Sequence, residues 1–230
     1  MGSEISTLED LVIPKRKALI FDLDGTLVDS KDQIGSALNR ARELFDFNPL
    51  SYQKREELLG LPIDFFLEDL ALSTQKSLEI IAEFRRTLQI SINDGNKLFA
   101  YAFEFISLSK DKGYKTGIAI SKPTYLAELV IVNSDLNNLI DVIQGTDGFP
   151  AKPDPTSIQK AMMRLDTESA IMIGERIEDI QAAKAAGIES IGIAQSFHNK
   201  ELLRDAGAKL AFDSFIELLN SDELDKLLID

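Results

Sequence analysis

The chain has 230 residues, of which 44% are apolar and 27% are charged, a composition typical of a folded domain and not of a disordered chain. Its 25 Lys and Arg residues against 38 Asp and Glu residues give a formal net charge of −13, which disfavours nucleic acid and anionic membranes as partners. Cysteine is absent and His198 is the single histidine, which excludes disulfides, thiol nucleophiles and cysteine-based zinc sites. Catalysis by this chain would therefore have to depend on carboxylates.

No stretch approaches 18 consecutive apolar residues, and the first 17 residues lack the apolar run of a signal peptide. We therefore expect a cytoplasmic protein.

Short apolar runs alternate with longer helical patterns, which predicts an α/β fold with a Rossmann-like parallel sheet and helices on its faces. The predicted strands are Lys17–Phe21, Lys115–Ile120, Asp141–Ile143, Ala170–Ile173, Glu189–Ile193 and Lys209–Phe212. The predicted helices between them cover residues 96–112, 123–133, 155–165, 178–186 and 199–206.

The region between the first two strands breaks this alternation, because it holds no strand pattern. It predicts four helical segments instead, at residues 31–46, 51–59, 62–71 and 74–90. We interpret residues 30–94 as an inserted helical module, residues 15–29 and 95–220 as the α/β core, and residues 221–230 as an acidic tail. Residues 213–230 carry six acidic residues and one lysine, which predicts a solvated helix.

Two aspartates follow the first strand directly, in the string Phe-Asp22-Leu-Asp24-Gly25-Thr-Leu. Residues two apart at a strand end point the same way, and ligands bind at the carboxyl edge of open parallel sheets. Two carboxylates there repel each other unless a cation lies between them, and oxygen ligands suit Mg²⁺. A simple turn is the alternative interpretation, since Asp and Gly are common turn residues.

The full string resembles the nucleophile motif of the haloacid dehalogenase superfamily, and the helical insertion resembles that family's type-1 cap. The resemblance covers about residues 15–212 and is nearest to the phosphoglycolate phosphatase-like and nucleotidase-like branch. It implies that Asp22 attacks phosphorus and forms an aspartyl-phosphate. It also implies that Asp24 acts as general acid and then as base, while its backbone carbonyl holds Mg²⁺.

The family's second motif is a strand that ends in a phosphate-binding Thr or Ser. Here the strand ends in Ile120-Ser121-Lys122. In the direct alignment Ile120 stands at the hydroxyl position and the site lacks that contact, whereas in a shifted alignment Ser121 supplies it. Both alternatives remain open, and the resemblance makes Ser121 and Lys122 candidate phosphate-binding residues.

The family's third motif is matched by Lys152-Pro-Asp-Pro. Lys152 would neutralise phosphoryl oxygens and Asp22 as a fixed positive charge.

The family's fourth motif is matched by Gly174-Glu175 with Asp179 four residues later, but Glu175 replaces the family's Asp. The extra methylene shifts the carboxylate by roughly 1.5 Å, so Glu175 either reaches Mg²⁺ directly or binds it through water. The resemblance thus implies a metal set of Asp22, Asp24, Glu175 and Asp179.

Other candidates are weaker. We interpret His198 as a surface loop residue. Arg55, Arg85 and Arg86 could meet a substrate anion, but arginines on helix faces are usually solvated or paired. The chain has neither a P-loop nor a Gly-x-Gly-x-x-Gly motif.

We therefore predict a Mg²⁺-dependent phosphatase that hydrolyses a small phosphorylated metabolite, a phosphate monoester, through an aspartyl-phosphate. Ile120 and Glu175 motivate an alternative, a catalytically weakened relative retained as a binding protein. A sugar-phosphate mutase of the same superfamily is a second alternative. The sequence identifies neither the ester nor the oligomeric state.

Overall fold

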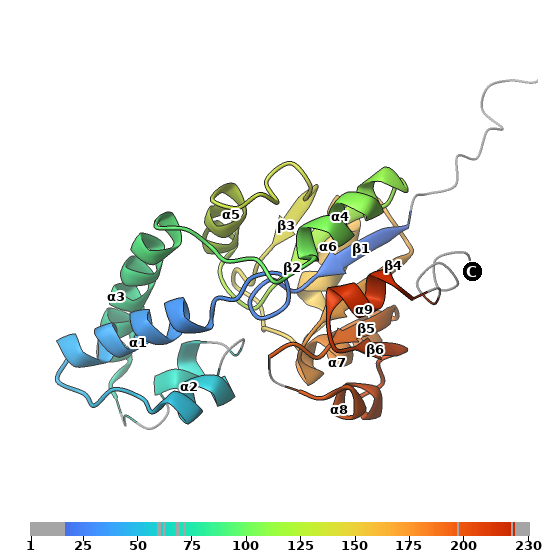
Figure 1. Cartoon of the computed structure of the whole chain (residues 1–230). Helices are drawn as coiled ribbons and strands as arrows, with labels where there is room; N and C mark the ends of the chain where they lie inside the picture. The colour runs from blue at the N-terminus through green and yellow to red at the C-terminus, as the bar shows by residue number, and fades with distance from the viewer. Residues whose placement is uncertain are drawn as a thin grey trace, which may run out of the picture.

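The computed structural model describes residues 17–58, 61, 63–67, 70, 72–196, 198–221 and 223. Its strands form one parallel sheet in the order β3-β2-β1-β4-β5-β6 (Figure 1). The strands are β1 (Ala18–Phe21), β2 (Lys115–Ala119), β3 (Val142–Gln144), β4 (Ala170–Gly174), β5 (Glu189–Ile193) and β6 (Leu210–Phe212). The α/β Rossmann-like prediction is confirmed, and each predicted strand lies within one residue of its expected bounds.

Helices cover both faces of the sheet because alternate residues of the central strand point to opposite sides. Leu19 and Phe21 of β1 belong to one buried apolar cluster, whereas Ala18 and Ile20 belong to the other. The helices from Ala102 onward are α4 (Ala102–Asp111), α5 (Thr124–Val132), α6 (Thr156–Arg164), α7 (Ile177–Ala186), α8 (Lys200–Asp205) and α9 (Phe215–Leu219). Helices α4, α5 and α9 contribute to the first cluster, and α6 and α7 contribute to the second.

Three aromatic rings in contact link helix α9 to the central strand β1. Phe21 meets Phe105 of α4 edge to face, with ring centroids 6.1 Å apart, and Phe105 lies 5.4 Å from Phe215 of α9. Phe215 and Leu218 are buried. The prediction of a solvated helix was therefore wrong for α9, because its apolar face packs on α4, and residues 222 and 224–230 lie outside the described part.

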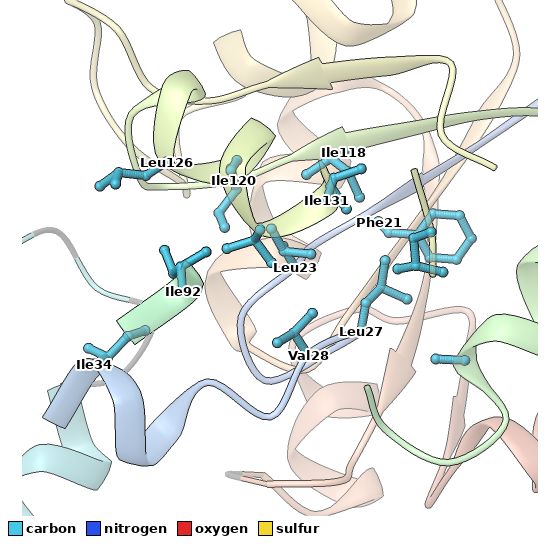
Figure 2. Close-up of a cluster of buried hydrophobic side chains, with 14 of the residues drawn as sticks. Phe21, Leu23, Leu27, Val28, Ile34, Ile92, Ile118, Ile120, Leu126 and Ile131 are labelled. Atoms are coloured by element: carbon cyan, nitrogen blue, oxygen red, sulfur yellow. The ribbon is translucent and has the colours of Figure 1, made fainter. Parts of the chain in front are cut away.

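The helices α1 (Lys31–Leu44), α2 (Tyr52–Leu58), η2 (Ile63–Leu67) and α3 (Thr74–Asn93) lie between β1 and α4, and we call them the helical segment. They stand to one side of the sheet, and α1 and α3 pack against each other (Figure 1). Ile34 of α1 and Ile92 of α3 join the apolar cluster of the sheet (Figure 2). The helix predicted over residues 62–71 is, within the described residues, the short 3₁₀ helix η2.

The helix predicted over residues 96–112 begins only at Ala102. The preceding residues are held by distant backbone partners: Asp29 N–H donates to Lys97 O at 2.8 Å, and Phe99 N–H donates to Leu27 O at 2.9 Å. These bonds replace the intrahelical ones that the local pattern predicted.

Among the described residues, every helix falls short of the length and apolar character needed to cross a bilayer.

Candidate active site

The carboxyl ends of three neighbouring strands, β2, β1 and β4, meet at one edge of the sheet. Asp22 follows β1 directly, and its N–H donates to Ile173 O of β4 at 2.9 Å. The strand order reverses between β1 and β4, because successive strands are added outward from β1 to β3 on one side and from β4 to β6 on the other. Such a switch point opens a crevice that binds ligands in α/β sheets.

Lys152 lies at the centre of this edge and is almost fully buried. Its Nζ lies 2.7 Å from Asp22 Oδ1 and 2.5 Å from Asp179 Oδ1, and it donates to Ala119 O at 2.9 Å. All three ammonium donors are therefore used, and the side chain is fixed in position. One buried ammonium group thus pairs with two buried carboxylates.

Burial and the neighbouring charges shift the pKa values of these side chains. Burial raises the pKa of Asp22 to about 7, with Lys152 opposing the shift and the charges of Asp179 and Asp24 adding to it. Burial disfavours the charged form of Lys152, but Asp179 and Asp22 outweigh it and raise the pKa of Lys152 above its usual value. Lys152 therefore stays charged, and further positive charge near Asp22 would favour its ionised form.

A second ion pair lies beside the first. Lys122 follows β2, and its Nζ lies 2.9 Å from Asp24 Oδ1 and 2.6 Å from Asp24 Oδ2. Both side chains are largely buried, at 12% and 6% exposure. The predicted phosphate-binding residue Lys122 and the predicted acid Asp24 are thus in direct contact.

Glu175 is fully buried, and neither carboxylate oxygen has a hydrogen-bond partner among the described residues. Burial, followed by the charges of Asp22 and Asp179, raises the pKa of Glu175 to about 8. The carboxylate lies against the turn after β1, where a Cβ added to Gly25 would stand 1.8 Å from Glu175 Oε1. Gly25 also has a φ of +85°, so only glycine fits this position without strain.

The charges of these groups fit a divalent cation. Four carboxylates (Asp22, Asp24, Glu175 and Asp179) and two ammonium groups (Lys122 and Lys152) leave a formal charge of −2 when all are ionised. The buried, unpartnered oxygens of Glu175 supply hard ligands of the type that Mg²⁺ takes. Within the described residues, however, no three carboxylate or histidine side chains form a complete metal cage by themselves.

Asp179 is placed differently from Glu175, because both of its oxygens are engaged. Oδ1 pairs with Lys152, and Oδ2 accepts the Arg176 N–H at 3.0 Å at the start of α7. A Cβ added to Gly174 would stand 2.4 Å from Asp179 Oδ2, so glycine at the end of β4 allows this approach.

Ile120 and Ser121, the two residues that the alternative alignments of the second motif place at the hydroxyl position, both lie at the site. Ile120 is buried in the apolar cluster with Leu23 and Leu126 (Figure 2). Half-buried Ser121 lines the same cavity as Asp22, and so does Thr146, whose hydroxyl donates to Ile120 O at 3.0 Å. Two hydroxyls therefore lie in the cavity wall around the position that Ile120 leaves without one.

The sequence pattern did not predict two further contacts, which involve Thr26 and His198. Thr26 Oγ1 donates to Asp22 Oδ2 at 3.3 Å. His198 is half-buried and not a simple surface residue, since its Nδ1 lies 3.2 Å from Glu175 O. Of the three candidate arginines, Arg85 lines the cavity next to the site. The spacing to Asp22 gave a weak signal for Thr26, whereas the His198 contact joins segments distant in sequence.

The cavity at this edge has a volume of about 390 Å³. Its floor holds Asp22, Asp24, Ser121 and Lys122 at the sheet edge, and residues of α1, η2 and α3 form the opposite wall. The helical segment therefore encloses the carboxylates from the side away from the sheet.

Known proteins match this arrangement over most of the chain. A family model described as haloacid dehalogenase-like hydrolase matches residues 19–193. A phosphoglycolate phosphatase from Colwellia psychrerythraea is 29% identical over 227 residues, covering 91% of this chain and 98% of that protein. The pyrophosphatase PpaX from Bacillus anthracis is 28% identical over 210 residues, covering 89% of this chain and 95% of that protein.

A solved structure shows the same likeness in three dimensions. A crystal structure of a predicted phosphatase from Clostridium acetobutylicum superposes with a TM-score of 0.79 at 28% identity, covering 88% of this chain and 96% of that one. The family match runs from β1 to β5 and so includes the strand ends that carry Asp22, Ser121 and Glu175.

Proposed function

The chain belongs to the haloacid dehalogenase-like hydrolases, and from this premise we propose that it is a Mg²⁺-dependent phosphatase that hydrolyses a small organic phosphate monoester through an aspartyl-phosphate. The observation that carries the proposal is the position of Asp22, a buried carboxylate at the switch point with Lys152 fixed 2.7 Å away.

In the first step, Asp22 attacks phosphorus and the bond between phosphorus and the ester oxygen breaks. Lys152 holds the attacking carboxylate and neutralises charge on the phosphoryl oxygens. Asp24 delivers a proton to the leaving oxygen, so the alcohol departs neutral. Lys122, which pairs with Asp24 in the structure, has an alternative anion in the entering phosphate and releases Asp24 for this task.

In the second step, water attacks phosphorus of the aspartyl-phosphate. Asp24 takes the proton of the water, phosphate leaves, and the Asp22 carboxylate is restored. The same residue thus acts as acid and then as base, and splitting the hydrolysis into two displacements lowers each barrier.

We propose that Asp22, the backbone carbonyl of Asp24 and Glu175 hold Mg²⁺, while Asp179 positions Lys152. The bound ion would supply positive charge that lets Asp22 ionise and accept a phosphate dianion. Glu175 fits this task best among the four acids, since its oxygens are buried and have no partner among the described residues.

We also propose that the helical segment, residues 30–94, is a cap that excludes water during the first step. Support comes from the cavity, whose walls are shared between the sheet edge and helices α1, η2 and α3. The remaining parts, residues 15–29 and 95–220, would then form the catalytic core.

The test is phosphate release from a panel of esters, including 2-phosphoglycolate, sugar phosphates and 4-nitrophenyl phosphate, with pyrophosphate as a further substrate. We expect release with Mg²⁺, none with EDTA, and none from Asp22→Asn. Asp29→Asn is the matched control, because Asp29 pairs with exposed Lys97 and is not one of the residues that line the cavity. Release that survives Asp22→Asn would refute the nucleophile assignment.

Ile120 in place of a hydroxyl residue keeps the weakened, binding-only relative as a second candidate. That candidate predicts Mg²⁺ or phosphate binding without turnover of any ester in the panel. A mutase would instead move the phosphoryl group between sugar hydroxyls with little free phosphate released.

A further inference from the structure

The cavity has two chemically different ends. Its floor carries the site residues, whereas the wall from the helical segment is apolar and includes Leu61, Ile63, Phe65, Phe66, Phe84 and Leu88. Phe65 stays 44% exposed although it is a large apolar residue. A cavity of about 150 Å³ holds a benzene ring, so about 390 Å³ has room for a phosphate together with a ring-sized apolar group.

Arg85 lies in this apolar wall, and the helix pattern explains its placement. The buried face of α3 contains Ile81, Phe84 and Leu88, and residues three and four apart share one face of a helix. Arg85 lies four after Ile81 and three before Leu88, so it points to the cavity side and is half-buried. Arg86 points outward, is 62% exposed and pairs with Glu83 at 2.7 Å.

Arg85 differs from the other charged residues that line the cavity in its contacts. Of the described residues, four charged ones line it: Asp22 and Asp24, Lys122, which is bound to Asp24, and Arg85. Among the described residues, none makes a hydrogen bond or ion pair with Arg85. A guanidinium within apolar surroundings is stabilised by an anion, and its planar fork matches carboxylate or phosphate oxygens.

We infer that Arg85 determines substrate specificity by binding a second anionic group, a carboxylate or a second phosphate, on a substrate whose central part is apolar. This inference rests on the proposed function and narrows it. The phosphate to be cleaved would lie on Asp22, the apolar part against the phenylalanines of the helical segment, and the second anion at Arg85.

Binding of non-hydrolysable phosphonates tests the inference without requiring turnover. The probes are benzylphosphonate, its 4-carboxy derivative and its 4-phosphonomethyl derivative, titrated with Mg²⁺ into the wild type, Arg85→Gln and Arg85→Lys. Arg86→Gln is the matched control from the next position of α3. Thermal unfolding of each variant checks folding, and Arg85→Lys carries the comparison if Arg85→Gln is unstable.

In the wild type, we expect at least one of the two doubly anionic probes to bind about 10- to 100-fold more tightly than benzylphosphonate. The probe that binds more tightly than benzylphosphonate shows whether Arg85 prefers a carboxylate or a phosphate. The gain should disappear in Arg85→Gln, persist in part in Arg85→Lys and stay unchanged in Arg86→Gln, while benzylphosphonate binds all four proteins alike.

Equal binding of the three probes, no binding of any probe, or a gain that survives Arg85→Gln would each overturn the inference. The ester panel separates this result from the proposed function. An Arg85-dependent gain without ester hydrolysis would leave the inference standing and refute the phosphatase. Ester hydrolysis without an Arg85-dependent gain would support the phosphatase and refute the inference about Arg85.

Discussion

Replacing Glu175 with Gln should stabilise the metal-free protein at neutral pH and remove its response to Mg²⁺. Glu175 is fully buried, and its pKa is raised from 4.5 to about 8, mainly by burial. A carboxyl group whose pKa is higher in the folded state binds its proton more tightly there, so the free energy of unfolding falls as the pH rises from about 4.5 to 8. In EDTA at neutral pH, the folded protein therefore loses stability because Glu175 stays protonated in the fold, whereas it ionises freely in the unfolded chain.

The magnitude follows from about 1.36 kcal/mol per pKa unit. The raised pKa of Glu175 lowers the free energy of unfolding by about 3 kcal/mol at pH 7 and by about 1 kcal/mol at pH 5. The Gln amide, left without a partner, costs about 1–3 kcal/mol at both pH values and so cancels from the comparison. The stability of Glu175→Gln relative to the wild type should thus rise by about 2–3 kcal/mol between pH 5 and 7, or roughly 4–12 °C in Tm.

Thermal unfolding in EDTA and in Mg²⁺ at the two pH values measures both effects. The wild type should gain Tm on adding Mg²⁺ at pH 7, and Glu175→Gln should gain little. Glu189→Gln is the control, since Glu189 forms an exposed pair with Lys209. A pH-independent difference between Glu175→Gln and the wild type, or an undiminished Mg²⁺ response, would refute the reasoning.

Three other substitutions address the fold and the site. Lys152→Met leaves Asp22 buried without its cation, so chemical denaturation should show a loss of about 3–5 kcal/mol together with loss of phosphate release; an unchanged midpoint would contradict this. Ile120→Thr adds a hydroxyl at the strand end, worth about 1–3 kcal/mol of phosphate binding, and should raise kcat/KM about 5- to 150-fold. No gain would mean that another group already fills that position. Phe215→Ala removes the ring packed on Phe105 and should cost about 3–5 kcal/mol by denaturation, whereas a solvated α9 would lose almost nothing.

The sequence predicted the sheet and the strand-end acids well, because both depend on local pattern. The apolar runs of β1, β2 and β4 are buried on both faces, and Asp22 follows β1 with no intervening residue. Family membership, expected from the string around Asp22, is confirmed by the match over residues 19–193.

The errors arose where distant contacts decide the structure. Residues before Ala102 pair with the backbone of Leu27 and Asp29, which no local periodicity reveals. The acidic composition after residue 213 concealed Phe215, whose partner lies on α4. The inward position of Arg85 likewise depends on how α3 packs beside the sheet edge, so the sequence could only name it as one of three candidate arginines.

Covalent trapping tests the central claim most directly. Asp24→Asn removes the base of the second step, so brief reaction with 4-nitrophenyl phosphate, whose leaving group needs little proton donation, should accumulate the phosphorylated enzyme. Peptide mass spectrometry after an acid quench should then find one phosphoryl group on Asp22 with Mg²⁺ and none with EDTA. A phosphoryl group on another residue, or turnover by the wild type with an unmodified Asp22 in the trapped variant, would contradict the account.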